Sequence, residues 1–457
     1  MIAVVGAGPA GLLAAWHAAR AGHEVVVLER SAAVGGLAGS FEVAGLRVDH
    51  GSHRLHPSID GALLADVRGL LGDDLQVRPR NGRIVLAGRP LAFPLRTTDL
   101  LRNLPRPVAA RMALDAVTAP LRHPRADTYT EVVRAGLGPT VERTFYGPYA
   151  RKLWGVDGDD LAGEVARRRI AASSPLAIAR KLRRAADPAK RTFLYPRRGF
   201  GQISEALADA ATAAGADIRL GAGVSTVEVG DDGARVASED GTVVEAQQVW
   251  STAPLGALAS MVDGAPTDIA AAASRLRHRA MVLLYLVVDA PRWTDLDAHY
   301  LPDPDVMATR VSEPKRYRDS VDDPADHTVL CAEIPCAVDD EVWLADPGDL
   351  AVRLVEELAA AGLPPIRVTS AEVRRVQRLY PVYTHGYERD LALVEGWVDG
   401  LPGVVTFGRQ GLFVADNTHH VLAMARDLAG CVGDDGGVDP RHWASARVAF
   451  RDFVVED

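Results

Sequence analysis

Cysteine is scarce in this chain, and its scarcity excludes two kinds of small scaffold. Only Cys331, Cys336 and Cys431 occur among the 457 residues. Three cysteines cannot build a framework of several disulfides, and their surroundings lack the Cys and His spacing of a zinc module. A reduced, cytoplasmic location is the expectation that fits this composition.

Long hydrophobic runs are missing as well. No stretch approaches the roughly 18 uninterrupted apolar residues that a transmembrane helix needs. Met1 is followed at once by Ile2–Val5, without the basic segment and cleavage site of a signal peptide. We therefore expect neither a transmembrane segment nor a secretory leader. The length suggests two domains, and 48% hydrophobic and 24% charged residues are ordinary for a globular protein.

Acidic residues are few in the middle of the chain. Between Arg78 and Arg198 there are 10 Asp and Glu against 25 Lys and Arg, although the whole chain has a net charge of -9. This basic middle favours a small anionic substrate or peripheral contact with an anionic membrane surface, and a solvated arginine-rich surface is the simpler interpretation. The basic residues follow no nucleic-acid-binding module, so nucleic acid is not expected as a partner. The sequence does not indicate an oligomeric state.

The first thirty residues hold the clearest motif. Residues 2–28 alternate as apolar strand, glycine turn, alanine-rich helix and apolar strand. The turn has the pattern G-x-G-x-x-G, in which the glycines allow a tight turn, close approach of a pyrophosphate and close packing of helix on strand. Glu29 stands 23 positions after Gly6, where a carboxylate can bind ribose hydroxyls. The unit therefore predicts a dinucleotide site.

A second glycine-rich turn, residues 34–41, follows Glu29 and Arg30 directly. A nicotinamide cofactor needs no such turn. A larger cofactor that runs extended across the sheet does, because its ribityl chain and pyrophosphate pass close to the backbone there. The sequence thus predicts FAD rather than NAD. We expect Cys431 well inside the last helix, and therefore FAD held without a covalent bond.

The Glu29-Arg30 and Gly35-Gly36 pairs resemble the FAD signature of the superfamily that contains amine oxidases, protoporphyrinogen oxidases and phytoene desaturases. Further segments resemble a subgroup related to UDP-galactopyranose mutase, and they follow the family's order along nearly the whole chain. These segments are Asp49–Pro57, Phe145–Gly155, Tyr195–Gln202, Leu379–Tyr383, Phe407–Gly411 and Asp416–His420.

Two departures separate the chain from the mutases. Their Tyr-Thr-x-Lys-Gln-Trp-Gly pattern corresponds here to Tyr149–Gly155, with Ala and Leu at the Thr and Gln positions. Their tyrosines before an Asp-Met pair correspond here to Leu412, Phe413 and Val414, before Asp416. The Tyr195–Gln202 segment is more similar to the oxidoreductase branch.

The motifs and the resemblance together imply two sets of site residues. His53 is a candidate proton carrier because a neutral imidazole titrates near pH 7. His50, His53 and His56 lack a matching carboxylate or cysteine cluster, so no metal is expected. The implied catalytic or substrate-facing residues are His53, Arg54, Tyr149, Lys152, Trp154 and Arg169. The implied FAD-binding residues are Gly6, Gly8, Pro9, Ala10, Gly11, Glu29, Arg30, Gly36, Leu37, Gly51, Ser52, His53, Val224, Gly408, Arg409, Asp416, Asn417 and Thr418.

The expected fold is α/β, a Rossmann-like FAD-binding domain of the glutathione-reductase type with an interleaved α+β substrate-binding domain. We expect the first domain from residues 1–60, 195–260 and 375–457, and the second, partly helical, from 61–194 and 261–374. Single elements expected are a hairpin at 83–95, helices at 100–122, 129–143, 200–214 and 350–361, strands at 224–229, 234–238, 243–250 and 281–288, and a last helix from Val421.

Three functions remain open from the sequence. The leading hypothesis is an FAD-dependent oxidoreductase that abstracts a hydride from a small, anionic or glycosyl substrate. The second is a redox-neutral nucleotide-sugar isomerase of the galactopyranose-mutase kind, working with reduced FAD. The third is a non-catalytic flavin-binding protein, which would not need so many polar and aromatic groups beside the flavin.

Overall fold

A five-stranded parallel sheet draws on both ends and the centre of the chain. The computed structural model describes residues 1–86, 88–92, 106–118, 127–169, 192–433, 436–453 and 455. The strand order is β19 (Val404–Thr406), β13 (Gln248–Ser251), β1 (Ile2–Val5), β2 (Val25–Glu29) and β9 (Asp217–Leu220). Successive residues of β1 face opposite sides, Ile2 and Val4 toward one core and Ala3 and Val5 toward another. Both faces are covered, which explains why the strands are apolar throughout.

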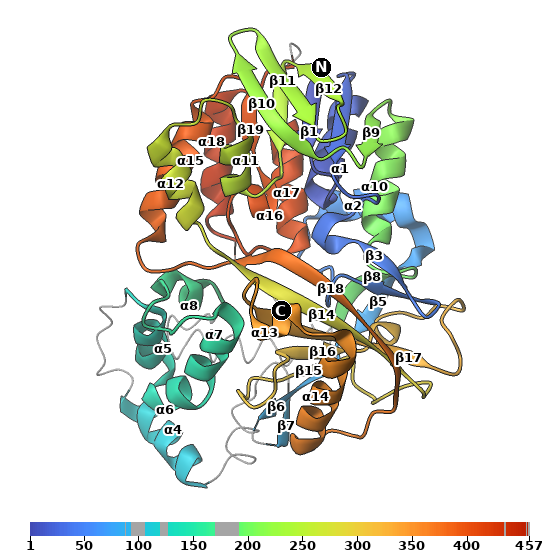
Figure 1. Ribbon diagram of the computed structural model, residues 1–457, viewed down its shortest axis with the longest axis vertical. Coiled ribbons are helices and arrows are strands. Elements are labelled where there is room, and N and C mark those ends of the chain that lie inside the picture. Colours follow the sequence, from blue (N-terminus) through green and yellow to red (C-terminus); the bar gives the residue numbers. More distant parts are fainter. Residues whose placement is uncertain are drawn as a thin grey trace.

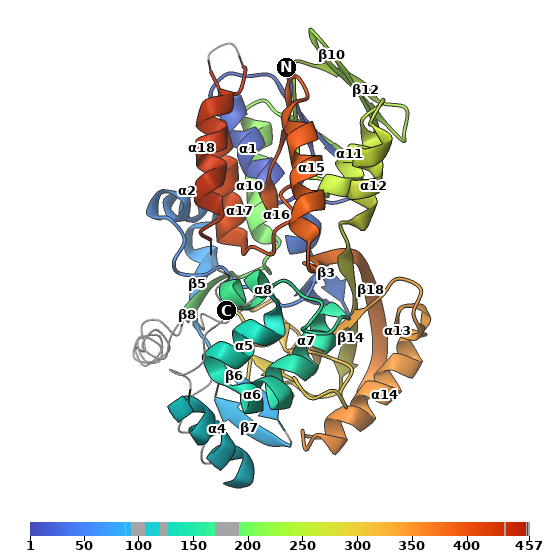
Figure 2. The ribbon, with the colours of Figure 1, turned by 90° about the vertical axis from the view of Figure 1, so that its left-hand side faces the viewer.

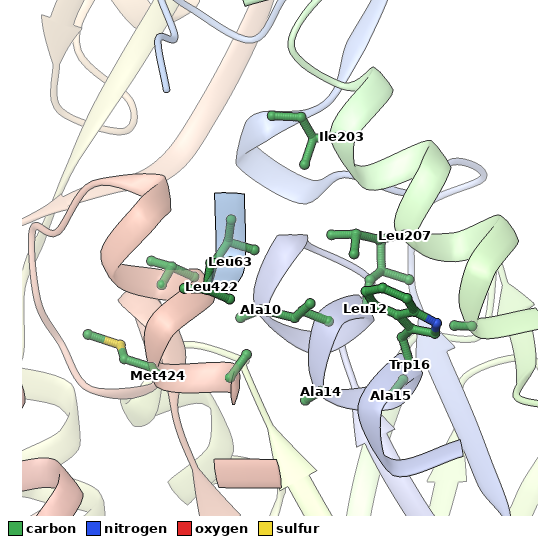
Figure 3. Close-up of a cluster of buried hydrophobic side chains, with 14 of the residues drawn as sticks. Ala10, Leu12, Ala14, Ala15, Trp16, Leu63, Ile203, Leu207, Leu422 and Met424 are labelled. Atoms are coloured by element: carbon green, nitrogen blue, oxygen red, sulfur yellow. The ribbon is translucent and has the colours of Figure 1, made fainter. Parts of the chain in front are cut away.

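Helices cover the two faces of this sheet. On one face α1 (Pro9–Arg20) packs between α10 (Gln202–Ala213) and α17 (Thr418–Ala429), joined by apolar side chains of all three helices (Figure 3). The same core includes α2 (Gly61–Leu71) and α18 (Pro440–Phe450). The other face carries α11 (Leu255–Met261), α12 (Thr267–Arg275) and α15 (Tyr387–Asp399).

An antiparallel meander also covers this second face. It consists of β10 (Val224–Gly230), β11 (Gly233–Ser238) and β12 (Val243–Ala246). The single strand predicted at 243–250 is wrong, because β12 ends at Ala246 and β13 begins at Gln248 in the parallel sheet. The polar residues Glu245, Gln247 and Gln248 mark this change of sheet in the sequence, and the prediction of one continuous strand passed over them.

A seven-stranded sheet forms the other half of the molecule (Figure 1). Its order is β18 (Val368–Pro381), β14 (His278–Val288), β17 (Thr328–Cys336), β16 (Arg310–Ser312), β15 (Ala298–Tyr300), β6 (Gly82–Leu86) and β7 (Arg89–Ala92). The fully apolar β14 pairs antiparallel with β17 and β18. One face packs on α14 (Pro347–Ala360) and the other on the hairpin of β3 (Ser40–Val43) and β4 (Leu46–Asp49).

A helical layer lies beside this sheet (Figure 2). Its elements are α4 (Arg106–Thr118), α5 (Tyr129–Leu137), α6 (Pro139–Val141), a π-helical turn (Glu142–Tyr146), α7 (Gly147–Trp154) and α8 (Gly163–Arg169). Remaining short elements are β5 (Leu75–Pro79), which pairs with β8 (Thr192–Pro196), α13 (Glu341–Leu344), α16 (Gly408–Gly411) and 3-10 turns at Gly36–Ala38, Gly72–Asp74 and Pro314–Arg316.

The fold class and most single elements are confirmed, and three corrections add to that of strand 243–250. The helix predicted over 129–143 ends at Leu137, because Gly138 has a φ of +98° and Pro139 follows. The helix predicted from Val421 as the last one is α17, which begins at Thr418 and is followed by α18. Cys431 lies just beyond the C-cap of α17, Gly430, instead of inside the helix. Residues 87 and 93–95 of the predicted hairpin and residues 100–105 and 119–122 of the predicted helix lie outside the described residues. The predicted domain division stays a prediction, and two of its boundaries fall inside β8 and β18.

Candidate active site

The first glycine turn lies between β1 and α1 and has no room for a side chain at Gly6 or Gly11. A Cβ on Gly6, whose φ is +101°, would lie 2.4 Å from Thr252 Oγ1, and one on Gly11 would lie 2.0 Å from Gly6 O. By contrast, a Cβ on Gly8 would meet nothing nearer than Gly35 O at 4.0 Å. Helix α1 begins at Pro9 with no side-chain cap on its N-terminus. Its first N–H groups are therefore available to a phosphate.

Glu29 ends β2 beside this turn. Its carboxylate is buried, with Oε2 accepting from Ala7 N–H (2.8 Å) and Oε1 from Ser31 N–H (2.9 Å). Each oxygen keeps a further lone pair for a ribose hydroxyl. The backbone at Glu29 and Arg30 also contacts residues 222 and 223, directly before the predicted cofactor residue Val224: Ala222 N–H donates to Glu29 O (2.8 Å).

Two distant segments close over the first turn. Gly35 N–H donates to Ala7 O (2.8 Å), and a Cβ on Gly36 would lie 3.5 Å from Gly8 Cα. Gly408, with a φ of +76°, approaches from the C-terminal part, and its Cβ would lie 3.2 Å from Ala10 Cβ. A glycine cradle, a helix N-terminus and a buried carboxylate thus fit the extended diphosphate and ribose of FAD. Leu37 lies in the 3-10 turn of the second glycine segment.

Arg409 fastens the start of α17 to β18. Its Nη1 donates to Asp416 O (3.1 Å) and its Nη2 to Leu379 O (3.2 Å). Asn417 caps α17 in a capping box with His420, and Thr418 is the first helical residue. Residues 408–418 therefore lie together, and their predicted contact with FAD stays a prediction.

The turn at residues 50–54 connects the hairpin of β3 and β4 to the seven-stranded sheet. Its histidines have separate partners: His50 packs on Phe41 (4.9 Å between ring centres) and His53 stacks on Phe200 (5.2 Å). His56 Nδ1 lies 2.7 Å from Ser58 Oγ. The three rings thus serve three different contacts.

His53 carries its proton on a defined nitrogen. Its Nε2 lies 3.0 Å from His50 O, and a carbonyl can only accept, so Nε2 is the N–H nitrogen of the neutral ring. Nδ1 has no hydrogen-bond partner in the described part of the chain. Burial lowers the pKa of His53, partly offset by the Asp49 carboxylate. Near neutral pH the ring is therefore uncharged, with Nδ1 able to accept a proton.

Arg54 is held inside the protein. Its Nη2 donates to Asp297 Oδ1 (3.0 Å) and its Nη1 to Tyr300 OH (3.2 Å). The guanidinium lies 4.8 Å from the ring centre of Tyr317 and 5.0 Å from that of Phe193. This position is structural, and the predicted contact of Arg54 with substrate stays a prediction.

The helical layer places the other predicted site residues apart from this turn. Trp154 is buried and packs near Tyr129 (5.9 Å between ring centres), so it belongs to the core. Tyr149 is half-buried and stacks on Phe145 (6.0 Å). Arg169 ends α8, and its side chain lies outside the described residues.

Lys152 bonds main-chain oxygens rather than a carboxylate. Its Nζ donates to Leu301 O (2.5 Å) and Asp303 O (2.9 Å), which joins α7 to the loop after β15. Burial lowers the pKa of Lys152 to about 7, opposed by Asp303 and Glu357. One N–H donor remains for the predicted anionic ligand.

This lowered pKa predicts a pH-dependent stability. Above pH 7 the folded chain releases the Lys152 proton while the unfolded chain keeps it, so the free energy of unfolding rises with pH. The rise from this residue alone should approach about 1.4 kcal/mol per pH unit between about pH 7 and 9. Lys152→Met should flatten the slope, measured by urea unfolding at three pH values. Equal slopes in parent and variant would contradict the assignment.

The sequence did not identify a polar network beneath the 50–54 turn. Glu333 Oε1 accepts from Ser52 N–H (2.8 Å), and Arg310 forms a bidentate ion pair with Glu333. Tyr317 OH hydrogen-bonds Ser52 Oγ, and burial raises the pKa of Tyr317 to about 12. One signal was available, since Glu333 is a lone carboxylate in the otherwise apolar β17. On Gly51, with a φ of +93°, a Cβ would lie 3.4 Å from Glu333 Oε1.

Asp49 is a second missed residue. Its Oδ1 accepts from Ser40 Oγ (2.6 Å) and Phe200 N–H (2.9 Å), and its Oδ2 from Tyr195 OH (2.5 Å). Tyr285 OH donates to Asp49 O (2.6 Å). Asp49 thus ties the end of β4 to β3, β8, β14 and the turn before α10.

The parallel sheet, the paired glycine turns and the buried Glu29 define an FAD-binding protein of the dinucleotide type. Residues 9–432 match the family model described as flavin containing amine oxidoreductase. The chain belongs to this family, and it is an FAD-dependent oxidoreductase. That its FAD is held without a covalent bond stays a prediction.

The individual proteins that match this chain do so either over a short segment or at low sequence identity. AofH of Mycobacterium tuberculosis, assigned to the flavin-containing monoamine oxidases, is 39% identical over 97 residues, so the match spans 21% of each chain. A reduced UDP-galactopyranose mutase structure covers 94% of this chain and 92% of its own, with 20% identity and a TM-score of 0.79. A structure from Exiguobacterium sp. 255-15, assigned as a protoporphyrinogen oxidase, covers 94% and 97%, with 18% identity and a TM-score of 0.74. The structure of putrescine oxidase bound to putrescine covers 94% of this chain and 98% of its own, with 19% identity and a TM-score of 0.64. At these identities the structural likeness shows the fold.

Across the described ranges, no helix is long and apolar enough to cross a membrane.

Proposed function

We propose that this chain abstracts a hydride from a C–H bond beside oxygen, nitrogen or a double bond in a small, anionic or glycosyl substrate. One observation carries the proposal. The 50–54 turn holds the uncharged His53, its Nδ1 without a partner among the described residues, where the FAD-binding segments meet the seven-stranded sheet. A proton acceptor at this junction suits removal of an O–H or N–H proton as the hydride leaves.

Each group has a defined part in this reaction. FAD, when bound, accepts the hydride, and oxygen or another acceptor later takes the electrons. His53 Nδ1 accepts the substrate proton, while the His50 carbonyl fixes the orientation of the ring. The N-terminal end of α17, capped by Asn417, supplies a positive helix end that would stabilise negative charge on the flavin side.

The anionic character of the substrate is supported mainly by the sequence charge between Arg78 and Arg198. Several arginines in the described part of this segment already pair with carboxylates. These are Arg78 with Asp319, Arg134 with Glu142, Arg151 with Asp157, and Arg197 with Asp74. Lys152, when protonated, keeps one N–H donor with which it would add an anion contact.

Anaerobic single turnover tests the function. Oxidised holoenzyme is mixed with alcohols, hydroxy acids, amines and glycosides in turn, and the visible flavin absorption is followed. At least one of these substrate classes should bleach it without added reductant. If all four classes leave the absorption unchanged, hydride abstraction from such substrates is wrong.

The mutase alternative is favoured by the likeness to UDP-galactopyranose mutase and opposed by the C-terminal site. Leu412 and Phe413 are buried, and Phe413 packs against Tyr383 and Tyr387. They stand where the mutases have tyrosines, and a site that loses its hydrogen-bonding groups loses orders of magnitude in activity. We expect no interconversion of UDP-galactopyranose and UDP-galactofuranose, even by dithionite-reduced enzyme. Robust interconversion that requires reductant would favour the mutase instead.

We also propose a cytoplasmic location, with peripheral contact to anionic membranes as a second role for the basic segment. The three cysteines are buried free thiols, which suits a reducing compartment. Co-sedimentation with anionic and neutral vesicles would separate the two locations, because only membrane contact predicts selective binding to the anionic vesicles.

A further inference from the structure

Arg310 uses only part of its guanidinium in the ion pair with Glu333. Its Nε donates to Glu333 Oε1 (3.0 Å), and its Nη2 donates to Oε1 (2.7 Å) and Oε2 (2.8 Å). Nη2 also approaches Ser52 O at 3.3 Å. Nη1 has no hydrogen-bond partner among the residues that the structure describes, and it is not one of the fully buried unpaired atoms. The side chain keeps 19% of its surface exposed, so the two N–H bonds of Nη1 are available to a ligand.

Arg310 lies beside the 50–54 turn, which its Nη2 approaches at Ser52 O. Arg310 stands on β16, in register with Tyr300 on β15 and Glu333 on β17. Its guanidinium lies 5.8 Å from the ring centre of Tyr300. Burial disfavours its charge, but Glu333 and nearby phenols hold the pKa of Arg310 well above its usual value. Arg310 also acts electrostatically on His53, the proposed proton acceptor.

Glu333 changes what Arg310 can recognise. The carboxylate is buried and bidentate, so the pair presents hydrogen-bond donors without net charge. An anion brought to Nη1 would lose its hydration and face the Glu333 carboxylate behind the guanidinium. A hydroxyl or carbonyl oxygen would accept the same hydrogen bonds at a much smaller desolvation cost.

We propose that Arg310 binds an uncharged hydroxyl or carbonyl oxygen of the substrate, and that Glu333 is the positioning residue that sets this preference. Glu333 also holds the Ser52 N–H, so one carboxylate aligns the recognition group with the turn that carries His53. This inference rests on the proposed function in placing the substrate at that turn. It assigns the oxygen-bearing end of the substrate to Arg310 and leaves any anionic group to bind elsewhere.

Benzamide and benzoate provide a matched pair of probes, alike in shape and different in charge. Both are titrated into oxidised holoenzyme, with the flavin visible spectrum as the readout of binding. The parent should bind benzamide about 10-fold more tightly than benzoate. Glu333→Gln keeps the side-chain shape and frees the Arg310 charge, so it should reverse the preference by about 10-fold. Arg310→Gln should weaken benzamide by about 10-fold or more.

Arg316→Gln is the control. It removes one positive charge, as Arg310→Gln does, but Arg316 pairs with the exposed Asp295 rather than with the 50–54 turn. This control should keep the parent preference. Should Glu333→Gln fail to retain FAD, Arg310→Lys replaces it and should weaken benzamide, because Lys cannot make the bidentate pair. A parent that prefers benzoate, binds neither probe, or keeps its preference in the variants would overturn the inference. The titrations involve no hydride transfer. If the probes show the predicted preference but no substrate bleaches the flavin, the proposed function is refuted and the role of Arg310 still stands.

Discussion

Oxidised His53→Ala holoenzyme is expected to lose its visible flavin absorption about 10²–10⁴-fold more slowly than the parent in anaerobic single turnover with the same substrate. The reason is the fixed tautomer of His53, which leaves Nδ1 as the proton acceptor. Alanine leaves no group to take the substrate proton. Because burial lowers the pKa of His53, the parent rate should persist below pH 6.5 and fall only as the imidazole becomes charged.

His56→Ala is the matched control, since His56 lies three positions away and contacts Ser58. It should bleach at the parent rate. His53→Gln should stay slow, because a glutamine amide can donate to His50 O but is not a useful proton acceptor. A His53→Ala enzyme that holds stoichiometric FAD and bleaches at the parent rate would show that another group accepts the proton.

Glu29→Ala is expected to weaken FAD binding by roughly 1.5–3 kcal/mol, about 10- to 150-fold. The variant loses the acceptors for the ribose hydroxyls, and it leaves the N–H groups of Ala7 and Ser31 without their partners. FMN has no adenosine ribose, so its binding should change much less. Quenching of flavin fluorescence on titration into apoprotein measures both affinities.

Glu29→Gln separates ligand binding from stability. Glutamine keeps one carbonyl acceptor at the end of β2, so its loss of FAD affinity should be smaller than that of alanine. Urea unfolding of the apoproteins measures how far each variant destabilises the folded chain, and so how much of the lost FAD affinity comes from a disturbed glycine turn. Equal losses for FAD and FMN, or a colourless, folded parent that takes up NAD, would refute the assignment.

The FAD-binding elements could be predicted from sequence because their signals are local. Gly6, Gly11 and Glu29 lie within one short unit of strand, turn, helix and strand. The structure confirms the close backbone packing at Gly6 and Gly11 that the glycine pattern implies. The second turn was predicted as a separate element. Its hydrogen bond from Gly35 to Ala7 shows that both turns form one cradle.

The substrate side was much less accessible to sequence reasoning. Arg310, Glu333 and Ser52 meet through three segments that are far apart in the chain. No periodic pattern specifies such a meeting, because it depends on the register of β15, β16 and β17. Arg54 shows how a long-range contact adds to what the local sequence suggests. Its place beside His53 predicts a substrate contact, which stays a prediction, and only the structure shows that Asp297, 243 positions later, binds its guanidinium inside the protein.

The strand order of the parallel sheet also affects the timing of folding during synthesis. β1 begins at Ile2, yet β19, which completes the sheet beside β13, ends only at Thr406. A ribosome must therefore translate about four hundred residues before the first strand has its full set of neighbours, whereas β14, β17 and β18 can pair earlier. Such long-range pairing slows folding and leaves apolar strands exposed on the nascent chain. Completion of the FAD cradle by Gly408 thus makes cofactor capture a late event in biosynthesis.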